Sequence, residues 1–152
     1  MWMERLTSIC ANCVFEEPAD PSDLADLIDA LLPEMPEDLC TLLAEANGVC
    51  YRMVVDPNAA IEEGVITMGL VSNTQDIWDD TNRYRSIDAA FNDSIMFGSM
   101  PNGDFLAYRY TSSGEAPDVW VISHENYDDR TRFAPTLDVA LRIILECAIA
   151  DV

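Results

Sequence analysis

The chain has 152 residues, and 28 acidic against 8 basic residues give it a formal net charge of -20 at pH 7. Hydrophobic residues make up 49% of the sequence, which excludes the composition of a disordered chain. The negative charge disfavours binding to nucleic acids and anionic lipids, because both carry phosphates, and it speeds encounter with a basic partner. We expect a single domain spanning residues 1–152, long enough to bury roughly 70% of its unfolded surface.

The first segment, MWMERLTSICANCVFEEP, mixes acids with short apolar pieces and lacks the basic and apolar regions of an export signal. No apolar run approaches the roughly 20 residues that span a bilayer. We therefore expect a cytoplasmic protein that does not enter a membrane. We assign this segment no regular helix or strand.

Five cysteines, an odd number without an export signal, indicate reduced thiols and not a disulfide framework. Cys10 and Cys13 form a C-x-x-C, which is half of a zinc site or a redox pair in other proteins. No second C-x-x-C or suitably spaced histidine pair completes a zinc site, and no preceding strand indicates a redox βαβ unit, so these roles are the less favoured alternatives. We expect no metal and no cofactor, and we expect Cys40 and Cys147 to pack in the core.

Two short amphipathic helices are predicted next. Ser22 is the expected cap of the first, in which leucines and isoleucines recur at helical spacing until Pro33 ends it. The second begins at Pro36, a residue suited to the first helical position. Asn47-Gly48 ends this helix, because glycine readily adopts the left-handed backbone that often follows a helix.

The rest of the sequence is richer in strand signals. Branched and apolar residues predict strands in 49–57 and 64–73, whereas the stretch from there to Ser94 alternates helical and loop signals. Two later strand-like runs, 94–99 and 104–111, are joined by turn residues and predict a hairpin. A third strand is predicted at 118–125, and a closing helix begins at Thr136. This order predicts an α+β domain with an antiparallel sheet flanked by N-terminal and C-terminal helices.

Nothing in the sequence assembles a catalytic site. His124 is the only histidine, and no G-x-S-x-G turn supplies a nucleophile for it, so we expect it to form hydrogen bonds at a strand end. Adjacent aspartates occur twice, but a chain this acidic contains such pairs without function. We therefore expect no enzyme and no catalytic residue. Measurable turnover or sensitivity to a chelator would indicate otherwise.

Four stretches together resemble a known family. They are MPEDLCTLLAEANGV, FGSMPNGDFLAYRY, APDVWVISHE and TLDVALRIIL. In this order they are similar to the SMI1/KNR4, or SUKH, superfamily, although Met35 stands where the family usually has leucine, and the similarity covers about 23–149. The resemblance implies a compact α+β fold used to bind proteins and not for catalysis. It does not align the segment NTQDIWDDTNRYRS or the CANC near the start.

Two functions stay open at this point. The resemblance and the charge favour a bacterial immunity protein that blocks the active site, or a neighbouring surface, of a cognate basic toxin such as a nuclease. The alternative is an intracellular scaffold or regulatory module unrelated to toxins, and a neighbouring toxin gene would favour the first. Most aromatic residues are expected in the core, while exposed ones are potential anchors. Eight acids on predicted turns and loops near aromatic residues are the candidate contacts: Asp76, Asp79, Asp80, Asp93, Asp104, Glu125, Asp128 and Asp129.

Overall fold

The computed structural model describes the chain except residues 32–33, 55, 57, 59–63, 111–116 and 151–152. Its helices are α1 (Trp2–Ile9), α2 (Pro21–Ala30), α3 (Glu37–Glu45), α4 (Thr74–Ile87), the 3-10 helix η1 (Ala89–Asp93) and α5 (Leu137–Ala150). Its strands are β1 (Cys13–Phe15), β2 (Val49–Val54), β3 (Val65–Val71), β4 (Ser94–Ser99), β5 (Phe105–Arg109), β6 (Asp118–Ile122) and β7 (Arg130–Ala134). The predicted end of the first amphipathic helix at Pro33 lies outside the described residues.

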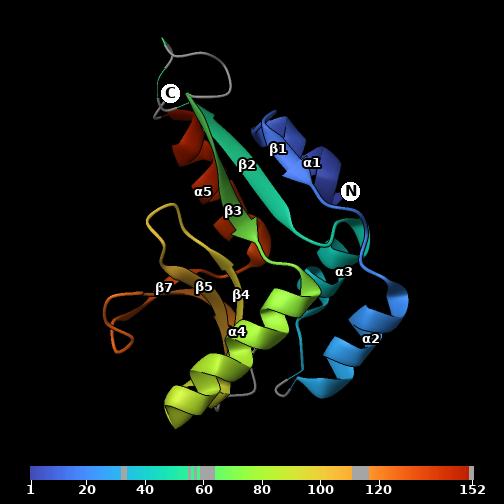
Figure 1. The fold of residues 1–152 in the computed structure, drawn as a ribbon, viewed down its shortest axis with the longest axis vertical. Helices are drawn as coiled ribbons and strands as arrows, with labels where there is room; N and C mark the ends of the chain where they lie inside the picture. The colour runs from blue at the N-terminus through green and yellow to red at the C-terminus, as the bar shows by residue number, and fades with distance from the viewer. Residues whose placement is uncertain (32–33, 55, 57, 59–63, 111–116, 151–152) are drawn as a thin grey trace.

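Within the described residues, seven strands form one antiparallel sheet in chain order from β1 to β7. The predicted α+β class, the hairpin of β4 and β5, and the third strand β6 are all confirmed. The sheet is nearly divided in the middle, because β3 and β4 share a single register pair, Val71 with Gly98. Beyond that pair the two halves diverge, and Figure 1 shows β2 and β3 rising away from β4 and β5.

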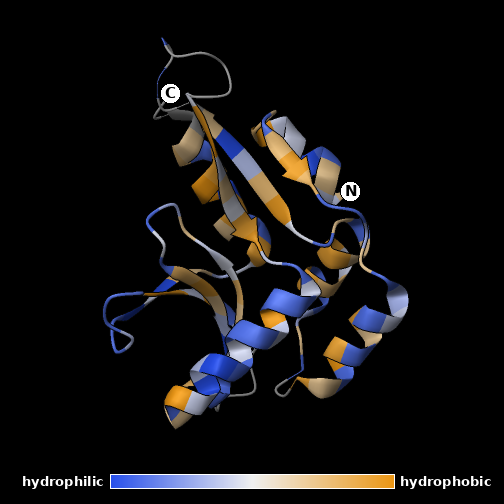
Figure 2. Cartoon of the chain, in the orientation of Figure 1, coloured by the Kyte–Doolittle hydropathy of each residue, from blue (hydrophilic) through white to orange (hydrophobic). Residues whose placement is uncertain are grey.

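Helices cover both halves of this divided sheet. The main core lies between α1, α3 and α5 and the strands, and it buries Leu39, Tyr51 and Leu141 completely or nearly so. On the other side, α4 packs on β4, where Tyr84 meets the rings of Phe105 and Tyr127 at centroid distances of 4.9 and 5.2 Å. Figure 2 shows that the outer face of α4 is largely hydrophilic. Helix α4 is therefore anchored through one face and presents the other to solvent.

Both ends of the sheet were missed from the sequence. Helix α1 and strand β1 occupy the N-terminal segment that was assigned no structure, and β7 occupies 130–134, where no strand was expected. Strand β1 is only three residues long, and β7 alternates arginine with threonine and phenylalanine, so neither has a strong apolar pattern. Strand β1 is stabilised by pairing with β2, and β7 by pairing with β6, although their local strand propensity is weak.

Three local predictions need correction. The cap of α2 is Asp20, whose side chain accepts from the backbone N–H of Ser22, so Ser22 itself is not the cap. Pro36 is the N-cap of α3 and not its first helical residue. Cys147 is exposed because the buried stripe of α5 runs through Leu141, Ile144, Leu145 and Ala148 and leaves position 147 on another side.

The close approach of β3 and β4 predicts a strong requirement for glycine at position 98. A Cβ atom there would lie 2.1 Å from the carbonyl oxygen of Leu70, whereas a Cβ at Gly69 would meet nothing nearer than Ser99 Oγ at 3.4 Å. We expect Gly98→Ala to lower the free energy of unfolding by about 1–3 kcal/mol, measured by urea titration. Gly69→Ala is the matched control, and equal effects of the two variants would contradict this account.

Candidate functional site

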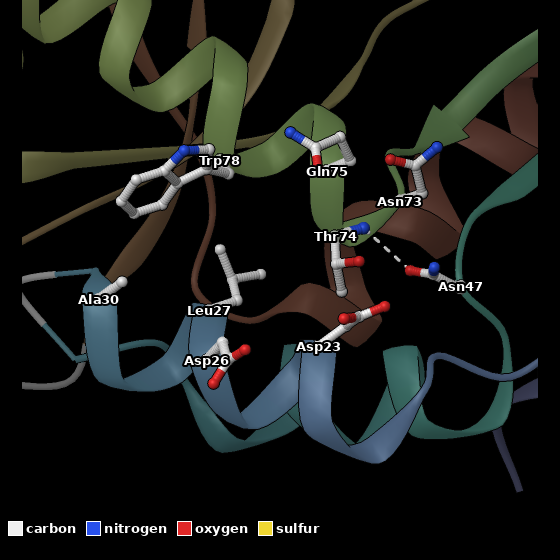
Figure 3. Close-up of a pocket in the computed structure, with 9 residues that line it drawn as sticks. All are labelled: Asp23, Asp26, Leu27, Ala30, Asn47, Asn73, Thr74, Gln75 and Trp78. Carbon is white, nitrogen blue, oxygen red and sulfur yellow. Dashed lines mark hydrogen bonds between the residues drawn. The ribbon is translucent and has the colours of Figure 1, made fainter.

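A surface hollow lies between α2 and α4, and we call it the α2–α4 groove (Figure 3). Its volume is about 490 Å³. Helix α2 forms one wall and the first turns of α4 form the other, with the turn before β2 closing one end. The lining residues are Asp23, Asp26, Leu27, Ala30, Asn47, Asn73, Thr74, Gln75 and Trp78.

Asn47 holds the closed end of the groove. Its side-chain oxygen accepts a hydrogen bond of 2.9 Å from the backbone N–H of Thr74. The backbone N–H of Asn47 donates to the carbonyl of Glu17 at 2.8 Å. The next residue, Gly48, has a φ of +122°, which confirms the predicted glycine turn. Asn73 then caps α4 by accepting from the N–H of Asp76 at 2.8 Å. Two asparagine side chains thus fix where α4 starts.

The groove has an apolar end and an acidic side. Trp78 projects from α4 toward Ala30 at the apolar end, with Leu27 beneath, and 38% of Trp78 is exposed. Asp23 and Asp26 follow along α2, both on its exposed side. Because α2 buries a narrow apolar stripe, its other positions carry acids that border the groove. The arrangement suits a segment that is partly apolar and partly basic.

A second hollow of about 460 Å³ adjoins the first and shares Asn47 and Asn73 with it. Glu16, Glu17 and Asp76 add three acids to its lining. All eight arginines of the chain belong to the described residues, and none of them lines either hollow. The two hollows therefore form a continuous surface that attracts cations.

The predicted contacts on α4 fall beside this surface. Asp76 and Asp79 are exposed, and Asp79 accepts a hydrogen bond of 3.0 Å from the side chain of Gln75. Asp80 is half-buried, and burial raises the pKa of its carboxyl group although Arg83 lies 3.9 Å away. Asp76 and Asp79 are thus available to a partner, while Asp80 is more constrained.

Two other predicted contacts are engaged within the fold. Asp93 pairs with Arg109 at 3.2 Å. Asp104 accepts from the backbone N–H of His124 at 3.1 Å, and its carboxylate lies 2.7 Å from Nδ1 of the same histidine. The predicted hydrogen-bonding role of His124 at the end of β6 is confirmed. Both carboxylates hold strand ends together and are less available for contacts with a partner.

The last three predicted contacts lie on the turn between β6 and β7. Glu125, Asp128 and Asp129 are exposed there, and the first two border a separate hollow of about 340 Å³ next to the end of α4. The structure therefore does not bring the eight candidates into one site. Asp23, Asp26 and Asn47 were missed as site residues. The acids on the polar side of the predicted first helix were a usable signal, whereas Asn47 was interpreted only as a helix end.

The C-x-x-C lies at the junction of α1 and β1 and is distant in the chain from the groove residues of α4. Both thiols are free, and Cys10 is buried. Burial, with a smaller contribution from Cys10, raises the pKa of the Cys13 thiol to about 12, which leaves little reactive thiolate at neutral pH. Among the residues that the structure describes, no three acids, cysteines or histidines gather where they could hold a metal ion.

Fold and site together define a class: a small α+β domain with a divided antiparallel sheet and an acidic groove between two helices. The chain belongs to the SMI1/KNR4 family (SUKH-1), whose family model matches residues 18–142. The match includes the whole α2–α4 groove. Comparison with curated proteins gives no match. In the described residues, no helix combines the length and apolar character needed to cross a membrane.

The asparagine that closes the groove makes a testable contribution to stability. Asn47→Ala leaves the N–H of Thr74 without its acceptor, and we expect the free energy of unfolding to fall by about 1–2 kcal/mol in urea titrations. Asn82→Ala is the matched control, since the Asn82 amide donates to the carbonyl of Trp78 at an exposed position. Similar losses in the two variants would contradict a special role for Asn47.

The Asp104–His124 contact predicts a pH-dependent contribution to stability. Burial opposes the charge of Asp104, but hydrogen bonds from the ring and backbone of His124 and from Asn102 outweigh it and lower the pKa of the carboxyl group. Because the pKa of Asp104 is lower in the folded protein than in the unfolded chain, its ionised form stabilises the fold at pH values above the unfolded-state pKa of about 4. This stabilisation is lost as the pH falls through the folded-state pKa. We expect Asp104→Asn to cost up to about 1 kcal/mol at neutral pH and progressively less in acid.

Urea titrations of both proteins across this pH range measure the effect. Asp128→Asn removes the same charge from the neighbouring exposed turn. If both variants lost the same stability with the same pH dependence, net charge and not the His124 contact would explain the result.

Proposed function

We propose that this chain is an immunity protein that acts inside a bacterial cell by binding and neutralising a toxin with a basic surface. The observation that carries the proposal is the acidic α2–α4 groove, with Trp78 exposed at its apolar end, on a chain of the SMI1/KNR4 family. Tryptophan is among the residues most often found at the energetic centre of protein interfaces. Carboxylates around it match a basic partner.

Neutralisation works by occlusion in this proposal, and the chain acts as a binding protein and not as an enzyme. A toxin that cleaves nucleic acid needs a basic groove for its substrate, and carboxylates on a folded domain can occupy that groove in place of phosphates. The net charge of -20 draws such a partner in and repels nucleic acid itself. The groove supplies the short-range contacts once the two surfaces meet.

The proposal is tested by capturing the partner and measuring its toxicity. Tagged protein is used as bait in extracts of its native cells at low salt, and the bound protein is identified by mass. We expect that protein to stop the growth of a test bacterium when expressed alone and to be harmless when this chain is co-expressed. A partner that does not affect growth would instead support an intracellular scaffold.

Charge steering gives a quantitative prediction for the captured pair. Asp76→Asn with Asp79→Asn removes two exposed carboxylates beside the groove. We expect a slower association rate, by about three- to ten-fold at low salt, and a weaker dependence on salt, measured by stopped flow. Glu4→Gln with Glu146→Gln removes the same charge from exposed positions on α1 and α5. Equal slowing by both double variants would show that net charge alone, and not this surface, guides association.

A further inference from the structure

Two of the three tryptophans are covered by an arginine of the same chain. The guanidinium carbon of Arg5 lies 5.1 Å from the ring centre of Trp2, and that of Arg109 lies 4.7 Å from the ring centre of Trp120. Each of these arginines also pairs with an aspartate, at 3.1 Å for Arg5 and 3.2 Å for Arg109. The fold thus builds the same unit twice: an indole, a guanidinium stacked on it, and a carboxylate that binds the guanidinium.

Trp78 is the third tryptophan, and it has only part of this unit. It is 38% exposed in the α2–α4 groove, with the carboxylates of Asp23 and Asp26 lining the same hollow. All eight arginines are among the described residues, the chain has no lysine, and no arginine stacks on Trp78. The nearest arginine along α4, Arg83, points its charge toward Asp80.

We propose that an arginine of the protein partner completes this third unit, stacking on Trp78 and pairing with Asp23 or Asp26. The inference rests on the proposed function in that the partner is the basic protein described above. Arginine fits better than lysine because its planar guanidinium can lie on the indole face and still donate two parallel hydrogen bonds to a carboxylate. Leu27 and Ala30, at the same end of the groove, provide contact for the methylene stem.

A purely apolar side chain is a poorer occupant of the same place. It would cover Trp78 but would also remove water from Asp23 and Asp26 without providing a donor, and unmatched carboxylates are costly to desolvate. A guanidinium satisfies both the indole and the carboxylates. The groove therefore selects for charge and shape together.

The test uses three short peptides and the intact protein. The probes are acetyl-Gly-Arg-Gly amide and its lysine and citrulline counterparts, added at millimolar concentration while the indole N–H signals are followed by ¹⁵N NMR. We expect the Trp78 signal to move with the arginine peptide and to give an affinity about five-fold higher than with lysine. Citrulline, which has the same shape without the charge, should cause little change. The signals of Trp2 and Trp120, already covered, serve as internal controls.

Variants separate the two halves of the proposed contact. Trp78→Leu keeps the carboxylates and should remove the preference for arginine over lysine; because it lacks the Trp78 indole, binding to it is followed through the backbone amide signals of α2. Asp23→Asn with Asp26→Asn keeps the indole and should weaken both cationic probes. An unmoved Trp78 signal, or equal responses to arginine and citrulline, would overturn the inference. A toxin neutralised equally well by Trp78→Leu would also overturn it and leave the proposed function standing. Selective arginine binding without any toxin partner would support this inference and contradict the proposed function.

Discussion

The hydrogen bond from the Thr74 backbone to Asn47 joins parts of the chain on which the rest of the structure depends. Asn47 follows α3, contacts the segment that follows β1 through the carbonyl of Glu17, and receives the first N–H of α4. The side chain and the backbone N–H of this one residue therefore connect the start of α4 to the end of α3 and to the segment after β1. Helix α2 packs on both α3 and α4, so this contact helps to place the two walls of the groove relative to each other.

The divided sheet explains why there is room for such a contact. In the described residues, β3 and β4 meet over a short stretch around Gly98, which passes the carbonyl of Leu70, and beyond that stretch the strands separate. The chain from the end of β3 then turns outward at Asn73 and forms α4, which returns over β4. A bulkier residue at position 98 would force the strands apart where the two halves of the sheet meet. The groove opens beside this junction.

The sequence predicted the central elements well because they carry strong local signals. The α3 helix, its Asn47-Gly48 end and the β4–β5 hairpin follow apolar periodicity and turn chemistry directly. Helix α1 and strands β1 and β7 were missed because their stability comes from pairing and packing with distant residues. Trp2 of α1, for example, is buried against α3. The α2–α4 groove could be predicted only in part. The apolar periodicity places Asp23 and Asp26 on the polar side of a helix. It does not predict which other helix faces them.

The distribution of the few arginines leaves most of the negative charge on the described surface without a neutralising partner. Five of the eight arginines pair with aspartates of the same chain, and Arg85 and Arg130 donate to backbone carbonyls. The cations are thus largely used for contacts within the chain, and most acids in the part of the chain that the structure describes form no ion pair. Repulsion among these acids lowers the stability of the free protein, although the same net charge favours solubility. Binding of the proposed basic partner would relieve that repulsion, so the same carboxylates that weaken the free protein would strengthen the proposed complex.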